Sequence, residues 1–232
     1  MSQPTNFLTL AQKVHELSGM GGSGPSAVTS QSGYNLKIVN WTNEAWYMLQ
    51  GMFEKWRFMR TSITKTLTVG TSNYDITASP FSLTDFGRWD ENSFTVNTSG
   101  DTDKTRVTFR DYPKFQAVYE TATFASGRPT AWTNPSAETL QFNAALDIAY
   151  ILSARYYRAP SNMSADTDAP TGLPKRFYML IVYEALKTLA IDRGTNELLI
   201  EANFKAADLL GKLMSAELEV EGTTTYSPLV TA

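Results

Sequence analysis

Residues able to carry out acid–base, nucleophilic or metal chemistry are few in this sequence and do not cluster. The chain has one histidine, His15, and no cysteine, which excludes disulfides, thiolate metal sites and multi-histidine metal sites. A histidine-dependent triad would need His15, which helical spacing places on the polar, exposed side of a helix. We therefore predict no catalytic, metal-binding or cofactor-binding residue among the histidines and cysteines.

Acidic pairs are the other candidates for chemistry. Asp166 and Asp168 are close in sequence, but they lack the glycine and the downstream glutamate of a calcium loop. Asp101 and Asp103 lie in a predicted turn, where solvated carboxylates are common. A glycosidase can assemble its two carboxylates from distant positions, so local spacing leaves that class open.

Two tryptophans also keep a carbohydrate function open. Trp89 and Trp132 fall on predicted loops of a β-rich region, where the flat apolar face of an indole ring could stack on a sugar. The same side chains equally suit a core or a subunit contact. One hypothesis is therefore a carbohydrate-binding or carbohydrate-cleaving module with these tryptophans as its platform.

Composition and charge limit the classes of protein to which this chain can belong. The chain has 232 residues, 20 Lys and Arg against 23 Asp and Glu, and a formal net charge of −3. Because there is no basic stripe, a dedicated duplex-DNA binder is not expected. No secretory signal is visible at the start, and the longest apolar stretch, residues 177–191, is interrupted by charges and too short to span a bilayer. We expect a soluble protein with no membrane partner.

Helical periodicity is confined to the two ends of the sequence. A first helix is predicted over residues 7–17, ending at Gly19, and a second over residues 30–60. The second carries a long apolar seam at alternating steps of four and three, a spacing typical of packing. The seam consists of Tyr34, Ile38, Trp41, Ala45, Met48, Met52 and Trp56.

Two further helices are predicted after Pro174. The first is apolar around nearly its whole circumference, which predicts a central buried helix, and it ends at Gly194. The last helix, residues 196–218, carries small and apolar residues at steps of three and four. These permit close helix approach, either within a bundle or against a neighbouring subunit, and they are Leu199, Ala202, Ala206, Leu209 and Leu213.

Between residues 61 and 168 the apolar period changes to two, which predicts β-strands. The expected strands are 64–69, 93–97, 106–109, 115–119, 140–144 and 148–157, and the last two are expected to form a hairpin. The predicted fold class is α+β, a helical bundle formed by N- and C-terminal helices with an inserted antiparallel β domain. Its predicted parts are N-terminal helices 1–60, a β domain 61–173, C-terminal helices 174–221 and an extended tail 222–232.

Several backbone motifs follow one another in a fixed order after residue 127. They are Gly127-Arg128-Pro129, then Tyr156-Tyr157-Arg158-Ala159-Pro160, then Asp168-Ala169-Pro170, then Leu173-Pro174 opening a helix. In this order, and with helices on either side, the chain resembles the head-to-tail adaptor (connector) proteins of tailed bacteriophages, particularly those of short-tailed viruses. The resemblance covers most of the chain, and its motifs are structural rather than catalytic.

The resemblance implies a virion structural protein that is not an enzyme. Such an adaptor docks as a ring under the portal protein and connects it to a tail or nozzle protein, forming part of the conduit for DNA during packaging and ejection. It also implies neighbouring copies in a dodecameric ring, with DNA passing through without specific binding. The expected location is the head–tail junction of the virion, and the host cytoplasm during assembly.

Two sets of residues are candidates for contacts, one implied by the resemblance and one by the spacing of apolar residues in the last helix. In related adaptors the carboxyl-terminal segment contacts the portal, which here gives the candidates Tyr226, Pro228, Leu229 and Val230. The apolar seam of the last helix, from Leu199 to Leu213, is the candidate for contacts within the bundle or between subunits.

Overall fold

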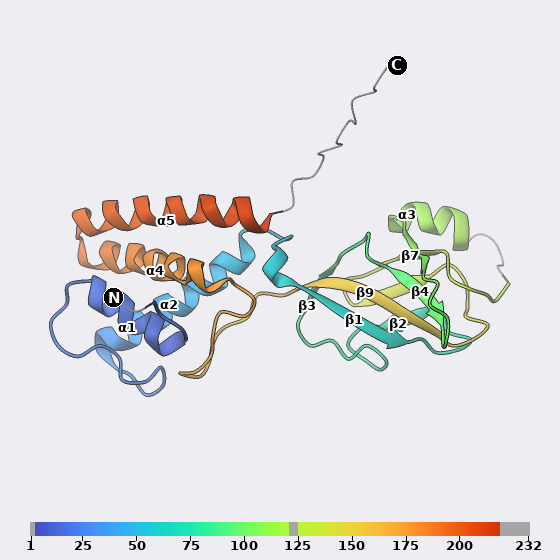
Figure 1. The fold of residues 1–232 in the computed structure, drawn as a ribbon, viewed down its shortest axis with the longest axis horizontal. Helices are drawn as coiled ribbons and strands as arrows, with labels where there is room; N and C mark the ends of the chain where they lie inside the picture. Colours follow the sequence, from blue (N-terminus) through green and yellow to red (C-terminus); the bar gives the residue numbers. More distant parts are fainter. Residues whose placement is uncertain (1–2, 121–124, 219–232) are drawn as a thin grey trace, which may run out of the picture. The chain divides into compact units, whose positions relative to one another are not determined.

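The computed structural model describes residues 3–120 and 125–218 and contains both helices and β-sheets (Figure 1). This confirms the predicted α+β class. The chain divides into two compact units, one that combines Met1–Met59 with Asn162–Ala232 and one made of Arg60–Ser161. We call them the helical unit and the β unit. Each has a hydrophobic core of its own.

The helical unit is built around one buried helix. It contains α1 (Phe7–Leu17), α2 (Gly33–Gly51), α4 (Tyr178–Arg193) and α5 (Asn196–Glu217), with short 3-10 turns η1 (Arg57–Met59) and η3 (Lys175–Phe177). Helix α4 packs against α1, α2 and α5, and it ends at Gly194 in the left-handed conformation, with φ 66°. The predicted central helix and its end are both confirmed.

The first turn of α1 is stabilised by a side-chain cap and by backbone hydrogen bonds to a distant loop. Asn6 caps the helix through its side chain, which accepts a hydrogen bond from the Thr9 amide at 3.0 Å. The neighbouring amides of Phe7 and Leu8 donate to the carbonyl oxygens of Asp168 (2.7 Å) and Asp166 (3.2 Å). Groups that a helix N-terminus leaves unsatisfied are therefore satisfied by a loop far away in the sequence.

That loop, residues 162–173, is organised by its own acidic side chains. The Asp168 carboxylate accepts hydrogen bonds from the amides of Ser164 (2.7 Å) and Ala165 (2.9 Å), and these bonds lower the pKa of Asp168. Asp166 accepts from the Val28 amide at 2.6 Å. The sequence analysis assigned this loop to the β domain, and here its hydrogen bonds reach the helical unit.

Helix α2 is shorter than predicted, and part of its predicted apolar seam is exposed to solvent. It ends at Gly51 rather than near residue 60, because the chain folds back and the Trp56 indole donates to the Leu49 carbonyl at 2.9 Å. Of the predicted seam, Ile38, Ala45 and Trp56 are buried. The residues Tyr34, Met48 and Met52 are 40%, 65% and 40% exposed.

The prediction of an exposed His15 is wrong. His15 is buried, and Gly24 lies directly over its imidazole, so that a Cβ at position 24 would stand 3.2 Å from the ring. The glycine-rich segment after α1 therefore covers a side that helical periodicity alone marks as polar. A histidine on a polar helix face is exposed only when no loop crosses that face.

The β unit consists of two sheets. The first contains β1 (Arg60–Thr66), β9 (Tyr150–Arg158), β4 (Thr95–Thr98) and β5 (Thr105–Arg106) in that order, and β3 (Phe86–Trp89) also pairs with β9. The second has the order β2 (Asn73–Asp75), β8 (Thr139–Phe142), β7 (Ala131–Thr133) and β6 (Thr108–Phe109). Only the β6–β7 pair among these ladders is parallel.

The predicted hairpin of residues 140–157 does not form. Strand β8 belongs to the second sheet and β9 to the first, because the backbone after β8 bonds elsewhere. The Asn143 amide donates to the Ala131 carbonyl at 3.1 Å, and the Leu146 carbonyl accepts from Gly70 at 2.8 Å. The connection therefore crosses from one sheet to the other.

Two other predicted strands differ in the structure. Residues 106–109 split into β5 and β6 on either side of Val107, whose amide donates to the Phe94 carbonyl as the chain changes sheets. Residues 115–119 are helical, forming the end of α3 (Tyr112–Phe115) and the π-helix η2 (Gln116–Glu120). Pro113 in the first turn of α3 favours that helical start.

The core of the β unit lies between its sheets and is rich in aromatic rings. Phe94 stacks on Trp132 with ring centroids 3.9 Å apart, and Trp89 meets Phe94 edge-on at 5.0 Å. Leu140 and Phe142 of β8 join the same cluster as Val96 of β4. Burial of these rings removes a large apolar area from water and so stabilises this unit.

We predict that Asp168→Asn lowers the free energy of unfolding by about 1 kcal/mol or less at pH 7, since part of the carboxylate faces solvent. The pKa of Asp168 is depressed in the folded state. Its contribution is therefore present above the ordinary aspartate pKa and is lost as the pH falls below it. The measurement is urea unfolding of both proteins at pH 7 and pH 3. The matched control is Glu44→Gln, which changes an exposed carboxylate that bonds to no described residue.

The prediction is contradicted if Asp168→Asn lowers the free energy of unfolding by the same amount at pH 7 and at pH 3.

A second prediction concerns the irregular pairing of β3 with β9. A Cβ at Gly87 would lie 2.9 Å from the Tyr157 carbonyl oxygen and 3.0 Å from the Ala159 nitrogen, both backbone atoms. Gly87→Ala should therefore destabilise the β unit by about 1–3 kcal/mol, measured by thermal unfolding. Gly127→Ala, where a Cβ meets nothing within 4 Å, should change the stability little, and equal effects of the two substitutions would count against this account.

Candidate assembly surfaces

The carbohydrate hypothesis fails on the position of its tryptophans. Trp89 lies on β3 and Trp132 on β7, and their exposed fractions are 4% and 0%. Phe94 meets Trp89 edge-on and stacks on Trp132, and Phe109 also packs against Trp132. A buried indole cannot stack on a sugar, so these residues form a core rather than a binding platform.

The acidic pairs have structural partners of their own. Asp166 and Asp168 hold the loop against α1, as described above, and Asp101 accepts from the Asp103 amide at 2.8 Å within a turn. Within residues 3–120 and 125–218, no group of three or more His, Asp or Glu side chains is placed to hold a metal ion. None of the helices described is both long and apolar enough to cross a membrane.

Helix α5 has two apolar sides. On one side Ala202, Ala206 and Leu213 are buried, with Leu199 and Leu209 half-buried, where the helix packs against α4. On another side Ile200 and Phe204 are 70% and 76% exposed. Both lie on the part of the helix that amphipathic periodicity reserves for polar side chains.

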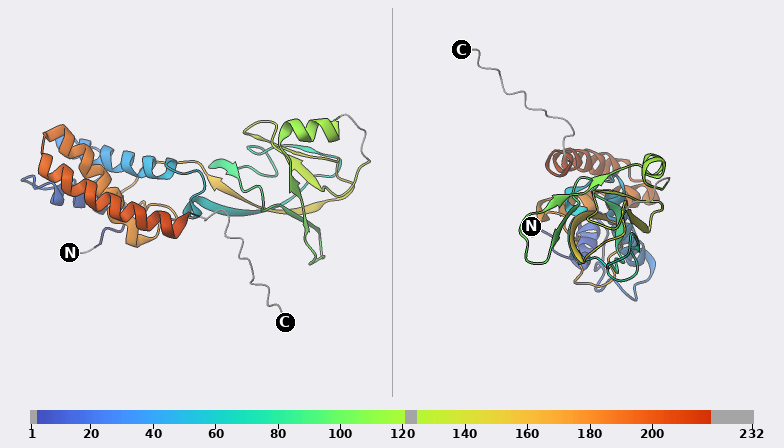
Figure 2. Two further views of the ribbon diagram at one scale, coloured as in Figure 1. Left: turned by 90° about the horizontal axis from the view of Figure 1, so that it is seen from above. Right: turned by 90° about the vertical axis from the view of Figure 1, so that its right-hand side faces the viewer.

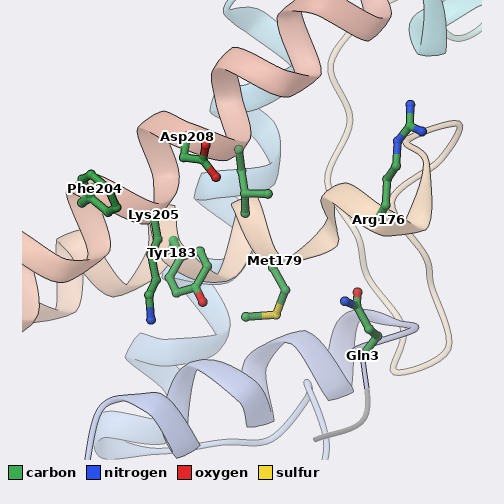
Figure 3. A pocket seen from close by; sticks show the side chains of 8 residues that line it. Gln3, Arg176, Met179, Tyr183, Phe204, Lys205 and Asp208 are labelled. Atoms are coloured by element: carbon green, nitrogen blue, oxygen red, sulfur yellow. The ribbon is translucent and has the colours of Figure 1, made fainter.

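A groove of about 300 Å³ runs beside Phe204 (Figure 3). Its lining comes from the segment before α1, from η3, from α4 and from α5. Met179 and Tyr183 of α4, both half-buried, line the groove together with Phe204. The lining residues are Gln3, Arg176, Met179, Tyr183, Phe204, Lys205, Asp208 and Leu209.

Two of the charged side chains that line this groove are paired within their own chain, and one is not. Lys205 pairs with Glu201 and lies 5.4 Å from the Tyr183 ring centroid, and Asp208 pairs with Lys212 at 2.6 Å. The glutamate raises the pKa of Lys205. Arg176 lies over the Phe177 ring at 4.8 Å, is exposed, and forms an ion pair with no residue that the structure describes. It is the available charge of the groove.

Helix α2 presents a second apolar surface, which we call the α2 surface. It consists of Trp41, Tyr47, Met48 and Met52 around the exposed carboxylate of Glu44. Tyr47 is 47% and Met48 65% exposed. Glu44 forms no ion pair or hydrogen bond within the described part of the chain. This surface therefore combines exposed apolar groups with one available negative charge.

The start of α2 is fastened to the end of α4. Lys37 forms an ion pair with Asp192 at 2.9 Å, and the Tyr34 hydroxyl donates to the same carboxylate at 2.9 Å. These bonds lower the pKa of Asp192 and raise that of Lys37. The charge of Lys37 on α2 is thus already paired within its own chain.

The predicted portal contacts Tyr226, Pro228, Leu229 and Val230 lie outside the described residues. The groove and the α2 surface were not predicted as sites. Phe204 and Ile200 on the polar side of an amphipathic helix were the signal that could have revealed the groove, since large apolar residues there need a partner. For the α2 surface the signal was the length of the predicted apolar seam from Tyr34 to Trp56. The helical unit buries only part of that seam, and the rest stays exposed.

Comparison with known proteins identifies the family. No curated protein matches the sequence. The family model of the SU10 adaptor protein matches residues 5–231, a range that includes the helices α1, α2, α4 and α5 and both sheets of the β unit. This agrees with the phage head-to-tail adaptor that the backbone motifs from Gly127 to Pro174 indicated. The chain therefore belongs to the SU10 adaptor protein family and is a phage adaptor protein.

Proposed function

We propose that this protein is the head-to-tail adaptor of a virion, docking as a ring under the portal protein and connecting it to a tail or nozzle protein. The observation that carries the proposal is the family match over residues 5–231. The exposed apolar surfaces on α2 and α5 support it, because large apolar side chains on a surface are typical of association sites. Such a protein acts by binding and has no catalytic role.

In this proposal the two units have separate tasks. The helical unit is the bundle of N- and C-terminal helices that forms the body of a dodecameric ring, and the β unit is the domain inserted in it. The seam from Leu199 to Leu213 holds α5 against α4, which leaves the opposite side of α5 for other contacts. A repeated body with two different contact surfaces suits a closed ring.

The same ring would form part of the DNA conduit. Each copy carries a net charge of −3, and several negative copies around an axis repel phosphates on average. DNA then passes during packaging and ejection without being bound specifically. The protein would reside at the head–tail junction of the virion and, during assembly, in the host cytoplasm.

The portal contact is proposed for the tail, residues 222–232. This segment has no charged residue, and its four Thr, one Tyr and one Val are types that favour extended backbone. Such a segment can add a strand to an exposed sheet edge or lie in a cleft of a partner. Tyr226, Pro228, Leu229 and Val230 are the candidate contacts.

The adaptor role predicts that the purified protein adds a closed ring to the portal ring encoded by the same genome. The measurement is cryo-electron microscopy of the mixture, with the added copies counted around the axis. A dodecameric ring stacked on the portal is the expected result. Portals that stay bare at saturating protein would contradict the proposal.

The proposed portal contact predicts that deletion of residues 222–232 abolishes docking. The melting temperature should change by less than about 2 °C, because the segment lies beyond the helix that packs on α4. Docking is measured by co-sedimentation with the portal ring, and deletion of Thr231 and Ala232 alone is the matched control. A truncated protein that docks as well as the full chain would rule out this contact.

A further inference from the structure

We propose that neighbouring copies associate head to tail through their helical units, with the α2 surface of one copy seated in the groove between α4 and α5 of the next. The occupant of the groove is thus a second copy of this chain. The inference deepens the proposed function and rests on it, since it specifies which faces meet in the ring.

The first argument is the placement of the two surfaces. Helix α4 packs against both α2 and α5, and the view from above shows α2 along one side of the helical unit and α5 along the other (Figure 2). One copy therefore cannot place its own α2 surface in its own groove. Two different surfaces on separate helices are what a heterologous, ring-forming contact requires.

The second argument is the match of apolar groups. Met48 is 65% exposed on α2, and Phe204 is 76% exposed at the groove. Methionine is unbranched and adapts to irregular spaces, and the groove of about 300 Å³ has apolar walls from Met179 and Tyr183. Seating Met48 and Tyr47 there would remove from water the most exposed apolar side chains of both surfaces.

The third argument is complementary charge. Of the two charged residues of α2, Lys37 is paired with Asp192 and Glu44 has no partner among the described residues. In the groove Lys205 and Asp208 are paired within α5, whereas Arg176 has no carboxylate partner in the part of the chain that the structure describes. Each surface therefore offers one available charge, and the two are opposite in sign. A Glu44–Arg176 pair between copies would fix the register of the contact.

The first test reverses these charges one at a time. Glu44→Arg and Arg176→Glu should each weaken association between copies about tenfold or more, because like charges then face each other. The double variant should restore it. Both residues are exposed, so circular dichroism should show an unchanged fold. Association is measured both as ring occupancy on portal particles and, without portal, by cross-linking.

Cross-linking is specific here because the chain has no cysteine. A Met48→Cys protein mixed with a Phe204→Cys protein should be joined by a short bismaleimide at least about tenfold more than either variant alone, as read on a denaturing gel. The matched control pairs Met48→Cys with Ile191→Cys, whose position is 67% exposed but lies outside the groove. Glu44→Arg introduced into the Met48→Cys protein should reduce the product, and Arg176→Glu in the partner should restore it.

Each outcome decides between the two proposals. Equal cross-linking of the test and control pairs, or full rings formed by both single charge reversals, would overturn the head-to-tail contact while the adaptor role stands. Bare portals with specific cross-linking would instead overturn the adaptor role while the contact stands. Efficient Met48→Cys self-linking would show that the same face meets itself and would also overturn the proposal.

Discussion

The helical unit depends on the burial of one helix. Helix α4 has apolar side chains around most of its circumference, and Leu180, Ile181, Val182, Ala185 and Leu189 are fully buried. Such a helix is stable in water only if other segments cover it. The first 51 residues and the last helix must therefore meet around α4, although more than 120 residues separate α2 from α4. Most of the chain between them is then free to fold as a second unit with its own core, and residues 60–161 do so.

Strand β9 has the corresponding role in the β unit. It pairs with β1 over residues 151–157 and with β3 and β4 on the other edge. The chain changes sheets after β1, after β2, at Val107 and after Phe142. Because the sheets face each other across Trp89, Phe94 and Trp132, the aromatic residues that suggested sugar binding are the ones that hold this unit together.

Sequence patterns predicted what local chemistry determines. The end of α4 at Gly194, the extent of α5 and the α+β class follow from glycine conformation and from apolar periodicity. The wrong predictions share another cause. In each of them a residue contacts a partner that the local sequence pattern does not include. The 140–157 hairpin was wrong because Asn143 bonds to Ala131, the long α2 because Trp56 bonds to Leu49, and the exposed His15 because Gly24 covers it. The groove was missed since it joins residues from the start, the middle and the end of the chain, whereas the family motifs from residue 127 onward were recognisable in the sequence alone.

The pairing of β1 with β9 has a consequence for how such a chain can change over evolution. Arg60, the first residue of the β unit, is the direct partner of Tyr157 across an antiparallel ladder, and Tyr157 lies only four residues before Ser161, the last residue of this unit. The chain therefore returns beside its point of entry shortly before it leaves the unit. Insertions or deletions in the loops between β1 and β9 therefore leave both covalent connections to the helices unchanged, because these connections lie next to the β1–β9 ladder.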